Sequence, residues 1–147
     1  HSNNSLTKVL EQTKIPIDFE VLSIDIDSYD LDVWETLEKY RPKIVVIEVN
    51  SSIKPGIIQR HNENNQGNSF SATVNVGKKK GYILVYHTGN CIFLRDDLKN
   101  KINYDKDLFN NPNVLFDKSW LNKKDSFFKH LLNRFNNEQS LIVFNWF

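Results

Sequence analysis

The chain has 147 residues with 39% hydrophobic and 25% charged residues, the composition of one soluble globular domain. Its formal net charge of +1 argues against a nucleic-acid-binding protein, and its apolar runs are far shorter than the roughly 20 residues of a membrane-spanning helix. The single cysteine, Cys91, excludes an intramolecular disulfide and fits a reducing compartment, so we expect a cytoplasmic protein without a membrane span.

Hydrophobic spacing predicts a strand, a helix and a second strand within the first fifty residues. After a short helix that Ser5 can cap, residues 19–26 form an apolar segment with an acidic end, which indicates a buried strand. Residues 30–40 carry apolar side chains at helical spacing. Residues 43–49 are rich in β-branched side chains, as in a central parallel strand that is covered on both faces. The order predicts a βαβ unit whose two strands are parallel neighbours.

A long polar loop, a helix and a hairpin follow in the sequence. Residues 50–68 are polar, and a loop of this length is usually either functional or disordered. Residues 69–80 predict a helix with Ser69 as its cap. Residues 82–86 and 91–94 flank a turn-rich link, which predicts an antiparallel hairpin.

Residues 101–147 are predicted as a tail to the α/β domain of residues 1–100. Within the tail, residues 119–135 predict an amphipathic helix, whose apolar side chains are Trp120, Leu121, Phe127, Phe128, Leu131, Leu132 and Phe135. The last segment, residues 141–147, is too apolar to remain in water. We expect it to pack on the domain or on a partner.

Oxygen-bearing side chains follow both predicted parallel strands. Asp25 and Asp27 end the first strand, and Glu48 and Asn50 end the second. Because ligands of open α/β sheets bind beyond the carboxyl ends of the strands, we expect these side chains to converge. Carboxylate and amide oxygens suit Mg²⁺ or Mn²⁺, which makes Asp25, Glu48 and Asn50 candidate metal ligands. Asp25 and Asp27 are the candidate catalytic carboxylates.

A structural interpretation of the same residues competes with this site. Asp27 or Ser28 can simply cap the following helix, and Glu48 can pair with a nearby lysine. Each remaining candidate for chemistry is expected to be a surface, hydrogen-bonded or core side chain, and these candidates are His61, His87, His130 and Cys91.

Three stretches carry a family resemblance. They are residues 16–34, with the strand end SIDID, residues 41–52, with VIEVN, and residues 69–98, with GYILV and the closing CIFLRDDL. Together they resemble the FkbM-type S-adenosylmethionine-dependent methyltransferases over roughly residues 5–98. Ser28 stands where many of these relatives have glycine.

The resemblance implies an α/β fold, namely the carboxyl-terminal half of a Rossmann-like class I methyltransferase sheet, with parallel strands and a closing antiparallel hairpin. It also implies methyl transfer from S-adenosylmethionine to a hydroxyl of a glycan or another small substrate. In the family, a glycine-rich loop and an acidic strand end hold the cofactor. None of the five glycines of this sequence forms a GxGxxG motif, so the cofactor-binding residues are unknown here and are expected upstream.

Two other functions stay open from the sequence. The residues can form a degenerate, non-catalytic half-domain that serves as an assembly or protein-binding module, or another doubly wound protein that binds a nucleotide or phosphate. In the half-domain interpretations, the strand at residues 21–26 becomes an edge with the composition of a buried strand. We therefore expect a second chain or an upstream segment to cover it.

Overall fold

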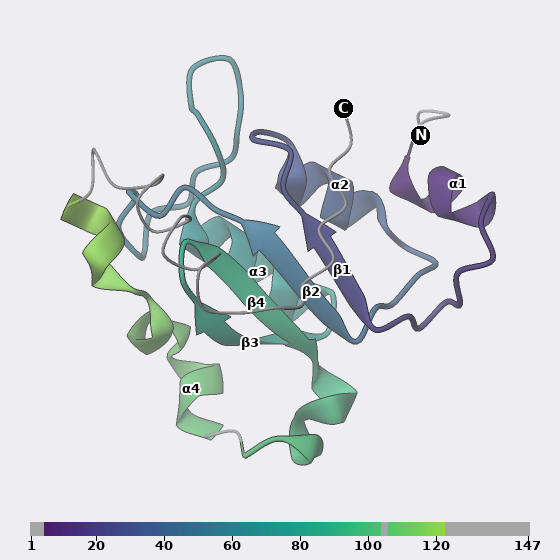
Figure 1. The fold of residues 1–147 in the computed structure, drawn as a ribbon. Coiled ribbons are helices and arrows are strands. Elements are labelled where there is room, and N and C mark those ends of the chain that lie inside the picture. Colours follow the sequence, from purple (N-terminus) through teal and green to yellow (C-terminus); the bar gives the residue numbers. More distant parts are fainter. Residues whose placement is uncertain (1–4, 104–105, 123–147) are drawn as a thin grey trace, which may run out of the picture.

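The computed structural model describes residues 5–103 and 106–122 and contains a four-stranded mixed sheet with the order β1-β2-β4-β3 (Figure 1). Strands β1 (Val21–Ile24) and β2 (Ile44–Glu48) are parallel. Strand β4 (Asn90–Arg95) pairs antiparallel with β2 and also with β3 (Tyr82–His87). The α/β class, the parallel pair and the hairpin are confirmed. The second strand of the hairpin, rather than the first, lies next to β2.

Helices precede, connect and follow the strands. They are α1 (Leu6–Glu11), α2 (Asp30–Thr36), α3 (Phe70–Lys79), η1 (Asp96–Lys101), α4 (Lys106–Asn110), η2 (Pro112–Leu115) and η3 (Lys118–Asn122). None of the helices within these described ranges is long and apolar enough to cross a membrane. Most of the predicted helix at residues 119–135, and all of residues 141–147, lie outside the described residues.

The start of α3 and the end of α2 are set by different kinds of interaction. Ser69 caps α3 as predicted, because its hydroxyl accepts a hydrogen bond from the Ala72 amide at 3.2 Å. Helix α2, in contrast, ends at Thr36 although the periodicity predicts a helix to residue 40. Leu37 leaves the helical conformation and packs with Phe19 in a small second cluster. Tertiary packing therefore ends α2 one turn early.

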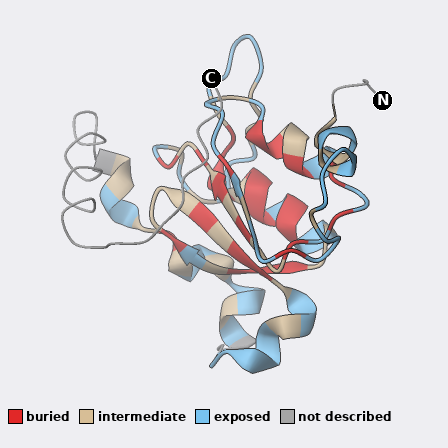
Figure 2. Cartoon of the chain, turned by 45° about the vertical axis from the view of Figure 1, so that its right-hand side comes forward, coloured by how far each residue is buried: buried red, intermediate tan, exposed pale blue. Residues whose placement is uncertain are grey.

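The main core lies on one face of the sheet. Val45, Ile47 and Val49 of the β2 segment pack there with Trp34 of α2 and Phe70 of α3 in one buried cluster. Figure 2 shows these buried segments of the helices and central strands in red. The alternate residues of β2 are only half-buried. The expectation that β2 is covered on both faces is therefore wrong for the described residues, and its β-branched composition fits one covered face.

A close contact between α3 and β4 depends on a glycine. A Cβ atom added at Gly77 would lie 2.5 Å from Cε1 of Phe93, whose side chain is fully buried. We expect Gly77→Ala to lower the free energy of unfolding by about 1–3 kcal/mol, because the ring has no room to move. The control Asn75→Ala changes an exposed residue of the same helix and should stabilise by about 0.5 kcal/mol. Urea unfolding of both variants tests the contact, and equal stabilities would contradict it.

Candidate functional site

Three carboxylates meet at the carboxyl ends of the parallel strands. In the paired strands Ile24 lies opposite Ile47, so Asp25 and Glu48 follow at neighbouring positions. One carboxylate oxygen from each of Asp25, Asp27 and Glu48 can be chosen so that all three lie within 4.8 Å of one another. Asp25 and Asp27 are exposed, and Glu48 is half-buried. The structure thus brings together three of the four oxygen-bearing side chains expected at this edge.

The three carboxylates face a cleft of about 600 Å³. Two further acidic residues line it, Asp30 and Asp117, and no lysine, arginine or histidine is among its described lining residues. The exposed ring of Tyr86 and the half-buried ring of Trp120 also line the cleft. Such a cleft can take a divalent cation or a neutral polar ligand, whereas an anion would meet like charge.

Asn50 lines the same cleft, but its side chain is engaged in the adjacent loop. Its amide nitrogen donates to the Gln66 carbonyl at 2.9 Å. Its amide oxygen accepts from the Ser52 hydroxyl at 2.6 Å and from the Ser52 amide at 3.2 Å. Both lone pairs of that oxygen therefore already have partners. The geometry favours Asn50 as a residue that shapes the loop over Asn50 as a metal ligand.

The loop between β1 and α2 is held by a carboxylate that the sequence interpretation did not select. Asp30 is buried, with only 3% of its surface exposed. Its two carboxylate oxygens accept backbone hydrogen bonds from Ile26 at 2.9 Å and from Ser28 at 3.0 Å. Between these two amides, Asp27 adopts a left-handed conformation with φ of 62°, which is uncommon for a residue with a side chain. Asp30 therefore fixes the turn that carries Asp27.

The capping interpretation of this loop is wrong. The N-cap of α2 is Tyr29, which makes no side-chain capping bond, and neither Asp27 nor Ser28 occupies that position. The Ser28 hydroxyl instead donates to the Ile26 carbonyl at 3.3 Å, and Asp30 holds the loop by accepting from the Ile26 and Ser28 amides. The lysine pairing considered for Glu48 is also not found, since none of the ion pairs between described residues involves Glu48.

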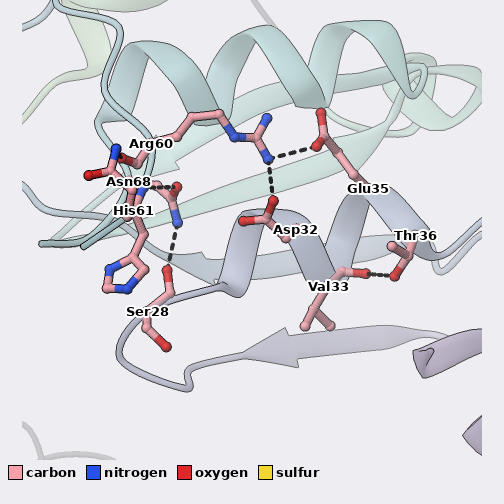
Figure 3. A network of polar contacts seen from close by, with 9 residues as sticks. Ser28, Asp32, Val33, Glu35, Thr36, Arg60, His61 and Asn68 are labelled. Atoms are coloured by element: carbon pink, nitrogen blue, oxygen red, sulfur yellow. Dashed lines mark hydrogen bonds and ion pairs between the residues drawn. The ribbon is translucent and has the colours of Figure 1, made fainter. Parts of the chain in front are cut away.

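The long loop at residues 50–68 is closed and attached to α2 (Figure 3). The Asn50 amide donates to the Asn68 carbonyl at 2.8 Å, which joins the two ends of the loop. The buried Asn68 side chain donates to the Ser28 carbonyl at 3.0 Å and accepts from the His61 amide at 3.0 Å. The loop therefore forms one wall of the cleft and supports the turn that carries Asp27.

A second attachment of this loop is ionic. Arg60 binds two carboxylates of α2, Asp32 at 3.0 Å and Glu35 at 2.7 Å, as Figure 3 shows. The guanidinium lowers the pKa of Glu35. The pairs are partly exposed, so each contributes little to stability alone. Together with Asn68 they hold the loop over α2.

A serine and a histidine lie beside the cleft, but their orientation excludes nucleophile activation. The Asp117 amide donates to Nδ1 of His87 at 3.0 Å, so Nε2 carries the ring proton. Nε2 then donates to the Ser51 hydroxyl at 3.0 Å, and that hydroxyl donates to the Gly89 carbonyl at 3.0 Å. Burial lowers the pKa of His87 to about 4, which keeps the ring neutral. The prediction of a hydrogen-bonded, structural histidine is confirmed for His87.

Burial and like charge raise the proton affinity of two members of the acidic group. Desolvation, followed by the charges of Asp25, Asp30 and Asp27, raises the pKa of Glu48 to about 7. Desolvation is also the main cause of the raised pKa of Asp25, with Asp30 and Asp27 contributing. With this pKa, Glu48 is half-protonated near neutral pH. A bound cation would favour its ionised form and relieve the repulsion among the three carboxylates.

Sequence reasoning missed Asp30, Asn68 and the Ser51–His87 pair. An aspartate at the start of a helix normally interacts favourably with the helix dipole. That common role already accounts for Asp30, so nothing in the sequence indicates that it also binds the loop amides. Asn68 lies in an asparagine-rich segment, where nothing local distinguishes a buried amide from exposed ones.

Comparisons of the chain with protein-family models, with curated proteins and with solved structures found no significant match.

Ionisation of Glu48 should make stability depend on pH. Between its unfolded pKa near 4.5 and its folded pKa of about 7, the folded chain binds more protons, so the free energy of unfolding falls as pH rises. Glu48→Gln cannot ionise and should remove this part of the fall. We expect it to exceed the wild type by about 1–2 kcal/mol at pH 8, after allowance for solvent screening, and to match it near pH 4.5.

Urea unfolding with a chelator present, at pH 4.5 and pH 8, measures this difference. The matched control is Glu38→Gln, which removes an exposed carboxylate outside the cleft. Parallel pH profiles for the wild type and Glu48→Gln would show that Glu48 ionises as an ordinary surface carboxylate.

Proposed function

We propose that this domain is the carboxyl-terminal half of an S-adenosylmethionine-dependent O-methyltransferase of the FkbM type, acting on a glycan or another hydroxyl-bearing small molecule. The observation that supports the proposal most is the convergence of Asp25, Asp27 and Glu48 beyond the ends of β1 and β2. Open α/β sheets bind ligands in this place. The parallel pair and the closing hairpin agree with the sheet that the resemblance implies.

The donor set of the acidic group fits Mg²⁺ or Mn²⁺. All three donors are carboxylate oxygens, the hard ligands that these ions prefer, and the exposure of Asp25 and Asp27 leaves room for retained water. When bound, such an ion supplies positive charge that lowers the cost of deprotonating a nearby hydroxyl. We propose Asp25, Asp27 and Glu48 as its ligands and give Asn50 the role of supporting the loop beside them.

The remaining roles in the proposed reaction belong to residues that the structure describes. The cleft accepts the neutral, hydroxyl-bearing substrate, since its acidic lining disfavours anions. Bound S-adenosylmethionine would supply the methyl group, and a carboxylate of the acidic group would accept the proton of the substrate hydroxyl. Asp25 and Asp27 are the proposed catalytic carboxylates. No described residue is assigned to the cofactor, because the chain contains no glycine-rich GxGxxG loop.

Cation binding by the 147-residue chain tests the site itself. We expect calorimetric titration with MnCl₂ to show one site, and Asp25→Asn to weaken its affinity at least about tenfold, since it removes a charged ligand. Asp18→Asn is the matched control, because it makes the same change at an exposed aspartate outside the cleft. Equal affinities for the two variants would exclude a cation site at Asp25.

Methyl transfer is tested on the longest natural form of the protein. Transfer of labelled methyl groups to hydroxylated acceptors should be abolished by Asp25→Asn and retained in Asp18→Asn, with the fold of both intact. A fully folded, active Asp25→Asn variant would remove Asp25 from the proposed mechanism.

The exposed edge of the sheet favours a second candidate, a non-catalytic assembly module. Strand β1 pairs only with β2 among the described residues, and Val21 on it is 53% exposed. An edge of this kind can accept a strand from a second chain or from an upstream segment. If copies of the chain associate through β1, Val21→Lys should convert dimers to monomers in sedimentation experiments. Val114→Lys, at a residue 59% exposed on η2, should leave the dimers intact. A wild-type chain that stays monomeric would exclude self-association through this edge.

A further inference from the structure

The second face of the sheet, opposite the main core, changes from apolar to acidic along the strands. The strand register assigns its side chains to three rows that run across the sheet. The first row is Val21, Ile44, Leu94 and Ile83; the second is Ser23, Val46, Ile92 and Tyr86; and the third consists of Asp25, which follows β1, with Glu48 and Asn90. Two rows that are apolar apart from Ser23 therefore lead to the acidic group.

Much of this second face is open to solvent. Val21 is 53% exposed and Tyr86 is 55% exposed, and Ile44, Val46 and Ile92 are only half-buried. Helices α2 and α3 contact the sheet from the core side (Figures 1 and 2). Ile83 and Leu94 are buried, so the exposed part is the side toward β1 and the acidic row. An apolar strip of this kind normally lies under another segment.

The sequence of residues 123–135 has the properties that such a covering segment needs. Phe127, Phe128, Leu131, Leu132 and Phe135 are spaced so that a helix would carry them on one face. The same segment has four basic residues, Lys123, Lys124, Lys129 and Arg134, against one acidic residue, Asp125. Apolar and basic side chains together match the apolar rows and the acidic row of the second face.

The end of the described chain lies close to this surface. Trp120 packs so tightly on Gly89 that a Cβ atom there would lie 2.8 Å from its ring. Gly89 directly precedes Asn90, a member of the acidic row. Thirteen helical residues extend about 20 Å, and three strand spacings cover about 14 Å, so residues 123–135 are long enough to cross the sheet.

We propose that residues 123–135 bind the second face of the sheet as an amphipathic helix, with Leu131 directed at the apolar rows and the basic side chains near Asp25 and Glu48. The proposed contact covers the exposed apolar rows of the second face. It does not depend on the proposed methyltransferase activity.

Cysteine cross-linking in the full chain tests this placement. Ser23→Cys puts a thiol at an exposed position of the second face, and Leu131→Cys puts one on the apolar side of the segment. Cys91 is fully buried and should not react. We expect a short bismaleimide to link the pair within one chain about tenfold faster than in either control, because a bound segment has a high effective concentration.

The two controls separate proximity from orientation. Asn75→Cys with Leu131→Cys moves the first thiol to an exposed residue of α3, on the core side of the sheet. Ser23→Cys with Asn133→Cys moves the second thiol to the opposite side of the predicted helix. Equal rates in all three pairs, or products that join two chains, would overturn the proposal, and the latter would identify a second copy as the occupant.

A second measurement covers the case in which a cysteine disturbs the fold. Leu131→Asp should raise binding of the hydrophobic dye ANS several-fold, because it uncovers the second face, and Asn133→Asp adds the same charge without this effect. Equal dye binding by Leu131→Asp and Asn133→Asp would also overturn the proposal.

Discussion

The parallel pairing of β1 with β2 is the constraint on which the candidate site depends. Its register sets Ile24 against Ile47, and so places Asp25 beside Glu48 where both strands end. The same geometry makes the site electrostatically costly, since burial and neighbouring carboxylates raise the pKa of Glu48 to about 7. Backbone hydrogen bonds of the sheet thus hold together acidic groups that would otherwise separate. A bound cation would be attracted to these carboxylates and would reduce the repulsion between them.

Two buried polar side chains give the site its shape. Asp30 accepts hydrogen bonds from two loop amides, and Asn68 links the turn after β1 to the long loop that forms one wall of the cleft. Neither side chain contributes apolar burial, and both would cost free energy if left without partners. Their value is therefore geometric: they hold Asp27 in a left-handed conformation beside the other two carboxylates. Rigid positioning of this kind is what a binding site requires.

The two faces of the sheet differ in composition and in burial. The core face, with Trp34, Phe70 and Phe93, supplies most of the apolar burial and sets the positions of the strands. The second face carries the acidic group at its end and an apolar strip beside it. Because stability comes mainly from one face, the other can present charged groups without undermining the fold. The proposed site and the proposed covering segment both follow from this division.

The local features of the fold were determined by the sequence. Apolar and β-branched runs predicted the strands, the turn-rich link predicted the hairpin, the βαβ spacing predicted the parallel pair, and Ser69 marked the start of α3, because these signals act over a few residues. The tertiary structure decided what depends on distant partners. Packing of Leu37 against Phe19 ended α2 early, and burial placed Asp30 where it binds two loop amides, whereas the sequence had offered Asp27 or Ser28 as a cap of the helix. Convergence of acidic side chains was predictable from strand ends, whereas their proton affinities required the burial and distances that only the folded chain provides.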